Sequence, residues 1–210
     1  MTPKLAQAVD PIFLHVLDLL DRIASNEQPS AQEERLRIRA LIDQAEAILG
    51  TGREWELTKY ALVSWIDEML VDAPWNGGDW WSNNVLEVEL FKTRLCNEQF
   101  YVRAGESSTL PTRDALEVYY VCVILGFRGL YRDPMLAESH GLPADLETWA
   151  QQISMSIRLG QGRPALSPPG PEIAGAPPLR TKSIVVWPLT TATMLLVSMI
   201  VCAWFWLRMS

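Results

Sequence analysis

The sequence has few of the residues, and none of the short motifs, that carry most enzyme chemistry. Its 210 residues include two histidines, His15 and His140, and three cysteines, Cys96, Cys122 and Cys202, with no CxxC or metal-ligand spacing. An odd number of scattered cysteines supports neither a disulfide framework nor a zinc site. The GxSxG, HExxH and phosphate-binding glycine motifs are also missing. We therefore expect no catalytic residue, no metal and no cofactor.

Strand patterns and basic residues are also scarce. Apolar and polar residues do not alternate over any strand-length segment, so no sheet is expected. Of the 18 basic residues, three lie from Arg180 onward, which leaves 15 against all 25 acidic residues before it, a formal charge of −10. Such a domain repels nucleic acid. We expect no nucleic-acid partner, and partner proteins with basic faces.

One long apolar segment organises the rest of the chain. Residues 184–207 hold no charged residue over 24 positions. At about 1.5 Å per helical residue they reach roughly 36 Å, enough to cross a bilayer core of about 30 Å. Trp187, Trp204 and Trp206 lie near the two ends, where the bilayer meets water. We interpret the segment as a transmembrane helix in contact with lipid; a buried soluble helix is the alternative.

The flanks of this helix predict its orientation. Arg180 and Lys182 precede it and Arg208 follows, and this two-to-one bias favours a cytoplasmic amino-terminal domain and a short periplasmic tail at 208–210. No secretory signal is recognisable, because His15 and Asp18 interrupt the first apolar run. We expect a tail-anchored protein that crosses the membrane once.

Helical patterns fill residues 1–160 and predict one all-α domain. Ser30 with Glu33 forms a capping box and Gly50 a stop signal, so one helix is expected over about 31–49. The helix before it starts at Asp10 with Pro11, or earlier at Thr2 with Pro3, and ends near residue 24. Further helices are expected at 54–71, from 82–84 to about 96, from 111 and from 142, with a short turn at 98–103. Leu146, Trp149, Ile153, Ile157 and Leu159 share one side of the last of these helices. The proline-rich residues 161–183 are expected to form a semi-extended linker.

Three polar residues interrupt the most apolar of these helices. Ser64, Asp67 and Glu68 recur at spacings of three and four, which places a hydroxyl and two carboxylates on one narrow stripe. Helical geometry alone favours a solvated edge, and contact with a partner is the other interpretation. A glycosidase-like acid pair is not favoured, because neighbouring helical residues point about 100° apart and cannot face each other across a substrate.

The next segment, 72–81, carries three tryptophans between its proline and glycines. Pro74 and the pair Gly77-Gly78 enforce a loop that presents Trp75, Trp80 and Trp81. Large aromatic side chains in such a loop usually fold back on a core and less often form a binding platform. We favour capping of the core.

A set of motifs follows a specific order over about residues 5–160. They run from Tyr60-Ala-Leu-Val-Ser-Trp-Ile-Asp-Glu68 through Leu86-Glu-Val-Glu-Leu-Phe91 and Glu98-Gln-Phe-Tyr101 to the most specific stretch, Leu116 to Arg132. Their characteristic residues are Trp75, Trp80, Glu87, Glu98, Tyr119, Tyr120, Gly126, Phe127, Arg128, Gly129 and Tyr131. This pattern resembles the DotU/TssL (IcmH) family.

The resemblance implies an inner-membrane subunit of a bacterial type VI secretion system, or of a related type IVB system. Family members have an all-helical cytoplasmic domain of two small bundles, set side by side like a hook, on one carboxy-terminal transmembrane helix. They dimerise, pair with the inner-membrane protein TssM (IcmF) and dock the cytoplasmic baseplate. The resemblance also matches Asp67 and Glu68, beside Ser64, to an acidic pair in a partner-binding cleft. We expect a structural adaptor; a tail-anchored enzyme acting on cell-wall sugar is the alternative.

The chain departs from this pattern at several places. Many relatives continue past the membrane helix into a peptidoglycan-binding domain, whereas three residues follow it here, so we expect another subunit to anchor the complex to the cell wall. Trp65 replaces a smaller side chain or phenylalanine, and Cys96-Asn97 replaces glycine. Within the membrane segment, a dimer seam is expected on the face that presents small residues for close approach. The seam residues are Thr191, Leu195, Ser198 and Cys202.

Overall fold

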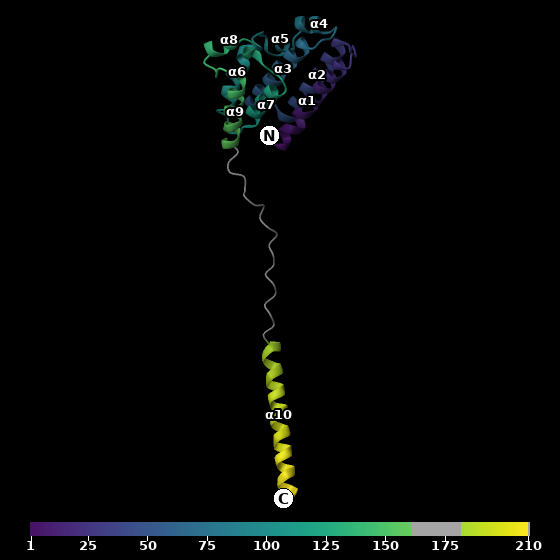
Figure 1. Cartoon of the computed structure of the whole chain (residues 1–210). Coiled ribbons are helices and arrows are strands. Elements are labelled where there is room, and N and C mark those ends of the chain that lie inside the picture. Colours follow the sequence, from purple (N-terminus) through teal and green to yellow (C-terminus); the bar gives the residue numbers. More distant parts are fainter. Residues whose placement is uncertain (161–181, 210) are drawn as a thin grey trace. The chain divides into compact units, whose positions relative to one another are not determined.

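The computed structural model describes residues 1–160 and 182–209. The chain divides into two units, residues 1–164 and residues 165–210, which are described separately here. The described residues contain helices and no strand, so the all-α prediction is confirmed (Figure 1). The helices of the first unit are α1 (Pro3–Ala24), α2 (Ala31–Leu49), α3 (Arg53–Asp72), α4 (Gly78–Asn83), α5 (Leu86–Phe91), α6 (Cys96–Ser107), α7 (Asp114–Ile124), the 3-10 helix η1 (Gly129–Arg132), α8 (Pro134–Ser139) and α9 (Leu146–Gly160).

The first two helices form a hairpin whose boundaries follow local capping signals. The Thr2 hydroxyl accepts a hydrogen bond from Leu5 N, so α1 takes the earlier of the two predicted starts. The Ser30 hydroxyl accepts a bond from Glu33 N at 3.4 Å, and α2 ends at Gly50, where φ is +85°. The predicted range of this helix, 31–49, is confirmed.

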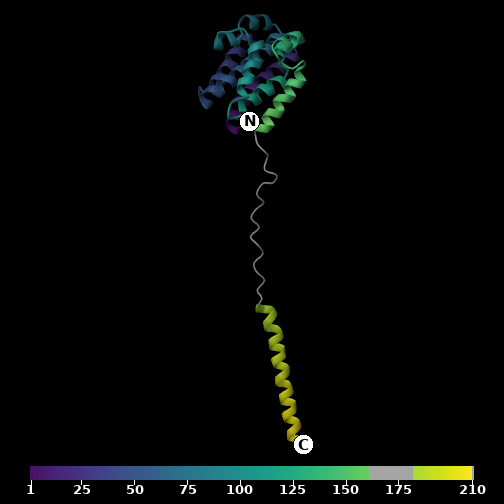
Figure 2. The ribbon, with the colours of Figure 1, turned by 90° about the vertical axis from the view of Figure 1, so that its left-hand side faces the viewer.

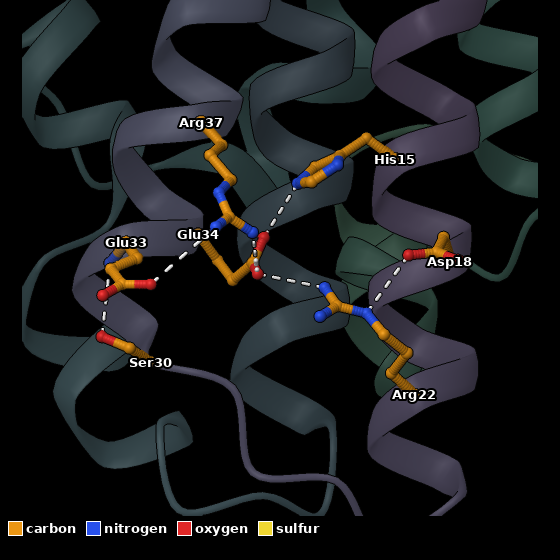
Figure 3. Close-up of polar contacts among 7 residues, drawn as sticks. All are labelled: His15, Asp18, Arg22, Ser30, Glu33, Glu34 and Arg37. Carbon is orange, nitrogen blue, oxygen red and sulfur yellow. Dashed lines mark hydrogen bonds and ion pairs between the residues drawn. The ribbon is translucent and has the colours of Figure 1, made fainter.

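A buried carboxylate ties the two helices of the hairpin together (Figure 3). Glu34 on α2 is 2% exposed, and its Oε1 accepts hydrogen bonds from the guanidinium groups of Arg22 and Arg37, each at 3.0 Å. Its Oε2 lies 2.9 Å from Nε2 of His15 on α1. Arg22 also pairs with Asp18 one turn away, so the cluster contains charges of both signs. The hairpin is therefore held by a paired charge as well as by apolar packing.

Helix α3 lies at the centre of the domain, and two groups of helices share it (Figures 1 and 2). The hairpin of α1 and α2 packs on one side, where the Phe13 and Trp65 rings lie 5.1 Å apart. Helices α6 and α7 pack on the other side, and α9 covers α7. Thirteen of the 20 residues of α3 are buried, which explains why its apolar pattern exceeds a single face. The two groups agree with the predicted pair of bundles.

The segment between α3 and α7 differs most from the prediction. The tryptophan loop contains the short helix α4. Helix α5 ends at Phe91 instead of continuing to residue 96, and Lys92 after it has a left-handed φ of +59°. Residues 98–103 were expected to form a turn, yet they belong to the 12-residue helix α6. The short helix α8 follows Asp133, whose side chain accepts a hydrogen bond from Met135 N at 3.0 Å.

The second unit contains helix α10 (Lys182–Met209). Within it, Thr191–Met209 is long and apolar enough to cross a membrane, by length and composition. Its described side chains are exposed in the single chain, as expected of a surface that meets lipid. The predicted linker at 161–183 falls almost entirely outside the described residues.

Candidate functional site

Asp67 lies in the interior of the domain and holds the start of α5. The residue is 3% exposed, and its Oδ1 accepts hydrogen bonds from Trp81 Nε1 and Leu86 N, both at 2.9 Å. Its Oδ2 accepts a third bond from Glu87 N, also at 2.9 Å. The first N–H groups of a helix have no partner within it. Because Val85 at the cap position of α5 has no polar side chain, Asp67 supplies the cap from α3.

Burial controls the acid–base behaviour of Asp67. The loss of hydration raises the pKa of its carboxyl to about 6, although the three hydrogen bonds lower it. The neighbouring charge of Glu87 also raises this pKa. The folded domain therefore favours the protonated carboxyl more than the unfolded chain does.

Glu68, the next residue, holds a different segment. Its carboxylate accepts hydrogen bonds from Arg128 N at 2.8 Å and Gly129 N at 3.0 Å, and it lies 3.2 Å from the Arg132 guanidinium. Gly129 has a φ of +51°, and a Cβ atom there would lie 2.9 Å from the Phe127 ring, so the position requires glycine. Glu68 thus fixes the turn between α7 and η1.

Glu87 is a third interior carboxylate, and it holds the segment that leads into α6. It is 1% exposed and accepts bonds from Tyr60 Oη at 2.7 Å and Thr93 Oγ1 at 2.8 Å. It also accepts bonds from Leu95 N at 3.0 Å and Cys96 N at 3.1 Å, where α6 begins. These three residues, Asp67, Glu68 and Glu87, are called the carboxylate triad below.

The interpretation of the polar stripe on α3 as a solvated edge was wrong. Ser64 is fully buried and donates a hydrogen bond to Tyr60 O at 2.8 Å, while Asp67 and Glu68 are 3% and 7% exposed. The spacing shows correctly that the three residues share a face. It does not show that α4, α5 and the turn before η1 cover that face.

A cleft of about 300 Å³ opens beside the triad, and its rim carries two arginines. Arg132 pairs with Asp72 as well as with Glu68. Arg94 donates to Ser82 O at 2.6 Å and has no acidic partner among residues 1–160 and 182–209. The other lining residues are Val71, Val85, Cys96 and Asn97.

The chemistry that this cleft offers is hydrogen bonding and ion pairing. Burial raises the pKa of the Cys96 thiol to about 12, so it stays protonated and is a poor nucleophile. The triad carboxylates are occupied by donors from the domain itself. No cluster of three histidine, cysteine or acidic residues that could hold a metal ion occurs in the described part of the chain. The exposed polar groups of the rim are the ones available to another molecule.

Comparison with protein families identifies the chain. A family model described as type VI secretion system protein DotU matches residues 4–210. The chain belongs to the DotU family. The match spans both the helical domain and α10.

The fold of this DotU protein is similar to a solved structure, the cytoplasmic domain of TssL from Acinetobacter baumannii. The TM-score is 0.60 at 23% identity, over 74% of this chain and 98% of that one. At this identity the likeness concerns the fold. No curated protein matched the chain.

The tryptophans of the DotU motif lie against the core. Trp75 is 8% exposed and donates its indole N–H to Leu70 O at 2.8 Å, and Trp81 is fully buried. Trp80 is partly buried and packs against the same core. The prediction that this segment caps the core is confirmed.

Other motif residues build the core around α6 and α7. Tyr119 and Phe127 are fully buried, and Phe127 stacks on Phe100 with 4.0 Å between ring centroids. The Tyr119 hydroxyl donates to a backbone carbonyl of α3 at 2.9 Å. Tyr131 meets the Tyr101 ring edge-on at 5.3 Å.

Four further motif residues have less enclosed positions. Tyr120 is half-buried on α7, and Gly126 has a φ of +110° that favours glycine. Glu98 is exposed near the start of α6. Arg128 contributes its backbone N–H to Glu68, while its side chain is exposed. Any role of these residues in partner binding stays a prediction.

The predicted membrane seam of this DotU protein lies on α10. Thr191, Leu195, Ser198 and Cys202 are exposed along the helix. Their successive spacings of four, three and four residues keep them on one face. Their role in dimerisation stays a prediction.

Sequence reasoning missed three parts of the site. Trp81 bonds to Asp67, Arg132 pairs with Glu68 and Arg94 lines the same cleft, each 14 or more positions from the α3 stripe in sequence. No spacing rule joins residues so distant. Two local signals exist: Trp81 shares its loop with the two tryptophans that the motif contains, and Arg132 ends the motif stretch that begins at Leu116.

Proposed function

We propose that this chain is a structural subunit of a type VI secretion membrane complex, anchored in the bacterial inner membrane by α10. The observation that carries the proposal is the family match over residues 4–210, which includes the helical domain and the apolar helix in one protein. The matching family is described as type VI, so we propose that system rather than the related type IVB system. An adaptor needs binding surfaces, and the exposed rim of the cleft offers one.

The proposed arrangement has the helical domain in the cytoplasm and the carboxyl terminus in the periplasm. The domain binds a TssM/IcmF-like inner-membrane protein and baseplate subunits, and the chain forms a homodimer through the seam on α10. The formal charge of −10 before Arg180 favours partners whose faces are basic overall, whereas the exposed Arg94 at the rim of the cleft favours an acidic group opposite it. Ser198 and Cys202 allow two membrane helices to approach closely.

The rim of the cleft is the proposed contact surface, in place of the acidic pair itself. Asp67 and Glu68 are buried and bonded within the domain, so a partner cannot reach them without displacing those bonds. Arg94 and Asn97 are exposed at the rim. Charge reversal at Asp67 would therefore test folding as much as binding.

A pull-down tests this proposal. The full chain and its Arg94→Glu variant are expressed with an amino-terminal tag, captured from detergent-solubilised membranes, and their partners are identified by mass spectrometry. We expect an IcmF-like protein and baseplate subunits with the wild type, and at least one of them reduced with Arg94→Glu. The control Lys4→Glu reverses another exposed cation, and partner recovery should not change. Recovery of neither class of partner by a folded, membrane-bound chain would refute the adaptor function.

A further inference from the structure

Helix α9 buries one face and leaves the other without a partner among residues 1–160 and 182–209. Trp149 and Ile157 are 4% and 7% exposed on the face toward α7, whereas Met155 and Leu159 are 64% and 77% exposed. The prediction that Leu159 shares the buried side was therefore wrong. Figures 1 and 2 both show α9 at the outer edge of the domain.

The outer face of α9 carries a stripe with opposite charges at its two ends. Glu147, Gln151, Ser154 and Arg158 follow one another at steps of four, three and four residues, so they share one face. They line a surface hollow of about 450 Å³. Glu147 accepts a hydrogen bond from Gln151 at 3.2 Å. Neither Glu147 nor Arg158 forms an ion pair within the described residues, although both are exposed.

This charge pattern is complementary to itself. We propose that two copies of this chain pair through antiparallel α9 helices related by a two-fold axis. If the axis passes between Gln152 and Ile153, Glu147 of each copy faces Arg158 of the other, because both lie the same number of residues from the centre. Two identical ion pairs then form between the two α9 helices, as an isologous interface requires.

Another helix with a single charge sign fits the stripe less well. A basic partner helix would match Glu147 and leave Arg158 facing a like charge, and an acidic one would do the opposite. The second copy satisfies both ends at once. Apolar residues flank the stripe, with Met155 on one side and Ile124 of α7 on the other. The two-fold rotation places the same flank of both copies on the same side of this interface. Met155 therefore lies on the same side as Met155 of the other copy, and Ile124 on the same side as the other Ile124.

The pairing deepens the proposed function, since it rests on the homodimer included there. A helix of about 22 Å makes an interface smaller than stable complexes need, so the contact is weak between free domains. Attachment of both copies to one membrane raises their effective concentration and makes a weak contact sufficient.

Charge exchange between two copies provides the test. Two differently tagged full-length chains are produced in the same cells, one is captured from solubilised membranes, and the recovery of the other is measured by immunoblot. When both copies carry Glu147→Lys, or both carry Arg158→Glu, two repulsive contacts replace two attractive ones. We expect recovery to fall about five- to tenfold.

The mixed pair decides whether the contact lies between copies. When one copy carries Glu147→Lys and the other Arg158→Glu, both contacts again join opposite charges, and we expect recovery within about twofold of wild type. That result also shows that both variants fold. The control Glu138→Lys, on the exposed surface of α8, should leave recovery unchanged.

Two outcomes overturn the proposal: equal recovery in all combinations, or a mixed pair as weak as the matched pairs. Mass spectrometry of the same eluates separates this failure from failure of the adaptor function. Secretion partners captured without any charge effect would reject only the α9 pairing. The expected charge effect without those partners would reject only the adaptor function.

Discussion

Replacing Asp67 by asparagine should change how the stability of the domain depends on pH. The wild-type carboxyl has a pKa of about 6 when folded, against an ordinary value of 3.8 for an aspartate side chain. Because the folded pKa is raised, the stabilising contribution of this group is fully present below about pH 3.8 and is lost as the pH rises through 6. Asparagine does not titrate and abolishes this contribution at every pH.

The size of the effect follows from the pKa and from the hydrogen bonds. A rise of about two pKa units corresponds to about 3 kcal/mol at 25 °C. Asparagine keeps an oxygen that can accept from Trp81 and Leu86. Its NH₂ group replaces the oxygen that accepts from Glu87 N, so two donors face each other there. The lost bond and the buried unsatisfied donor cost about 1–3 kcal/mol at all pH values. The variant should be less stable than wild type, by about 2.5 kcal/mol more at pH 4 than at pH 7.5, because part of the contribution is already lost at pH 4.

Urea unfolding of residues 1–164, which form one compact unit, measures this difference. Wild type and Asp67→Asn are unfolded at pH 4, 5, 6 and 7.5, and the difference in unfolding free energy is plotted against pH. Ser139→Ala, an exposed change on α8, controls for general pH effects. A difference that does not vary with pH, or that increases above pH 6, would show that burial does not dominate the pKa of Asp67.

Three further changes test other parts of the fold, each by thermal or urea unfolding. Glu34→Ala leaves the guanidinium groups of α1 and α2 without their buried acceptor and should lower the unfolding free energy by about 2–3 kcal/mol. The control Glu33→Ala, at an exposed position, should lower it by less than about 1 kcal/mol. Equal effects would contradict the role of the buried cluster. Phe100→Ala empties the centre of the aromatic core and should cost about 3–5 kcal/mol, against about 0.5 kcal/mol for the half-exposed Val102→Ala. Lys92→Gly removes a side chain from a position with a left-handed φ and should stabilise the domain by about 0.5–1 kcal/mol. A loss of stability would show that the backbone at Lys92 is not strained.

The long helices could be predicted because their signals are local. Thr2, Ser30 and Gly50 mark helix ends by chemistry that acts within four residues, and apolar spacing defines the faces of α1, α2 and α3. The region from α4 to α6 could not be predicted in this way. Asp67 caps α5 from another helix, and Glu87 holds the start of α6, so the deciding contacts are distant in sequence.

The candidate site was predicted in its composition but not in its exposure. The spacing of Ser64, Asp67 and Glu68 groups them correctly on one face of α3. Whether such a face meets water or other helices depends on tertiary packing, which the pattern of one helix does not contain. Arg94 has no local signal at all, because its position at the rim results from the fold of the whole segment.

The carboxylate triad also implies an order of assembly. A helix of six residues such as α5 does not persist in water by itself, so it depends on Asp67 of a formed α3. Glu87 is in turn placed by α5, and it holds the N–H groups of Leu95 and Cys96 at the entrance to α6. The amides of Leu86, Glu87, Leu95 and Cys96 should accordingly exchange their hydrogens as a single cooperative unit. We therefore expect the rim of the cleft to open and close as one unit, and a partner that bound there would select the closed form of the entire segment.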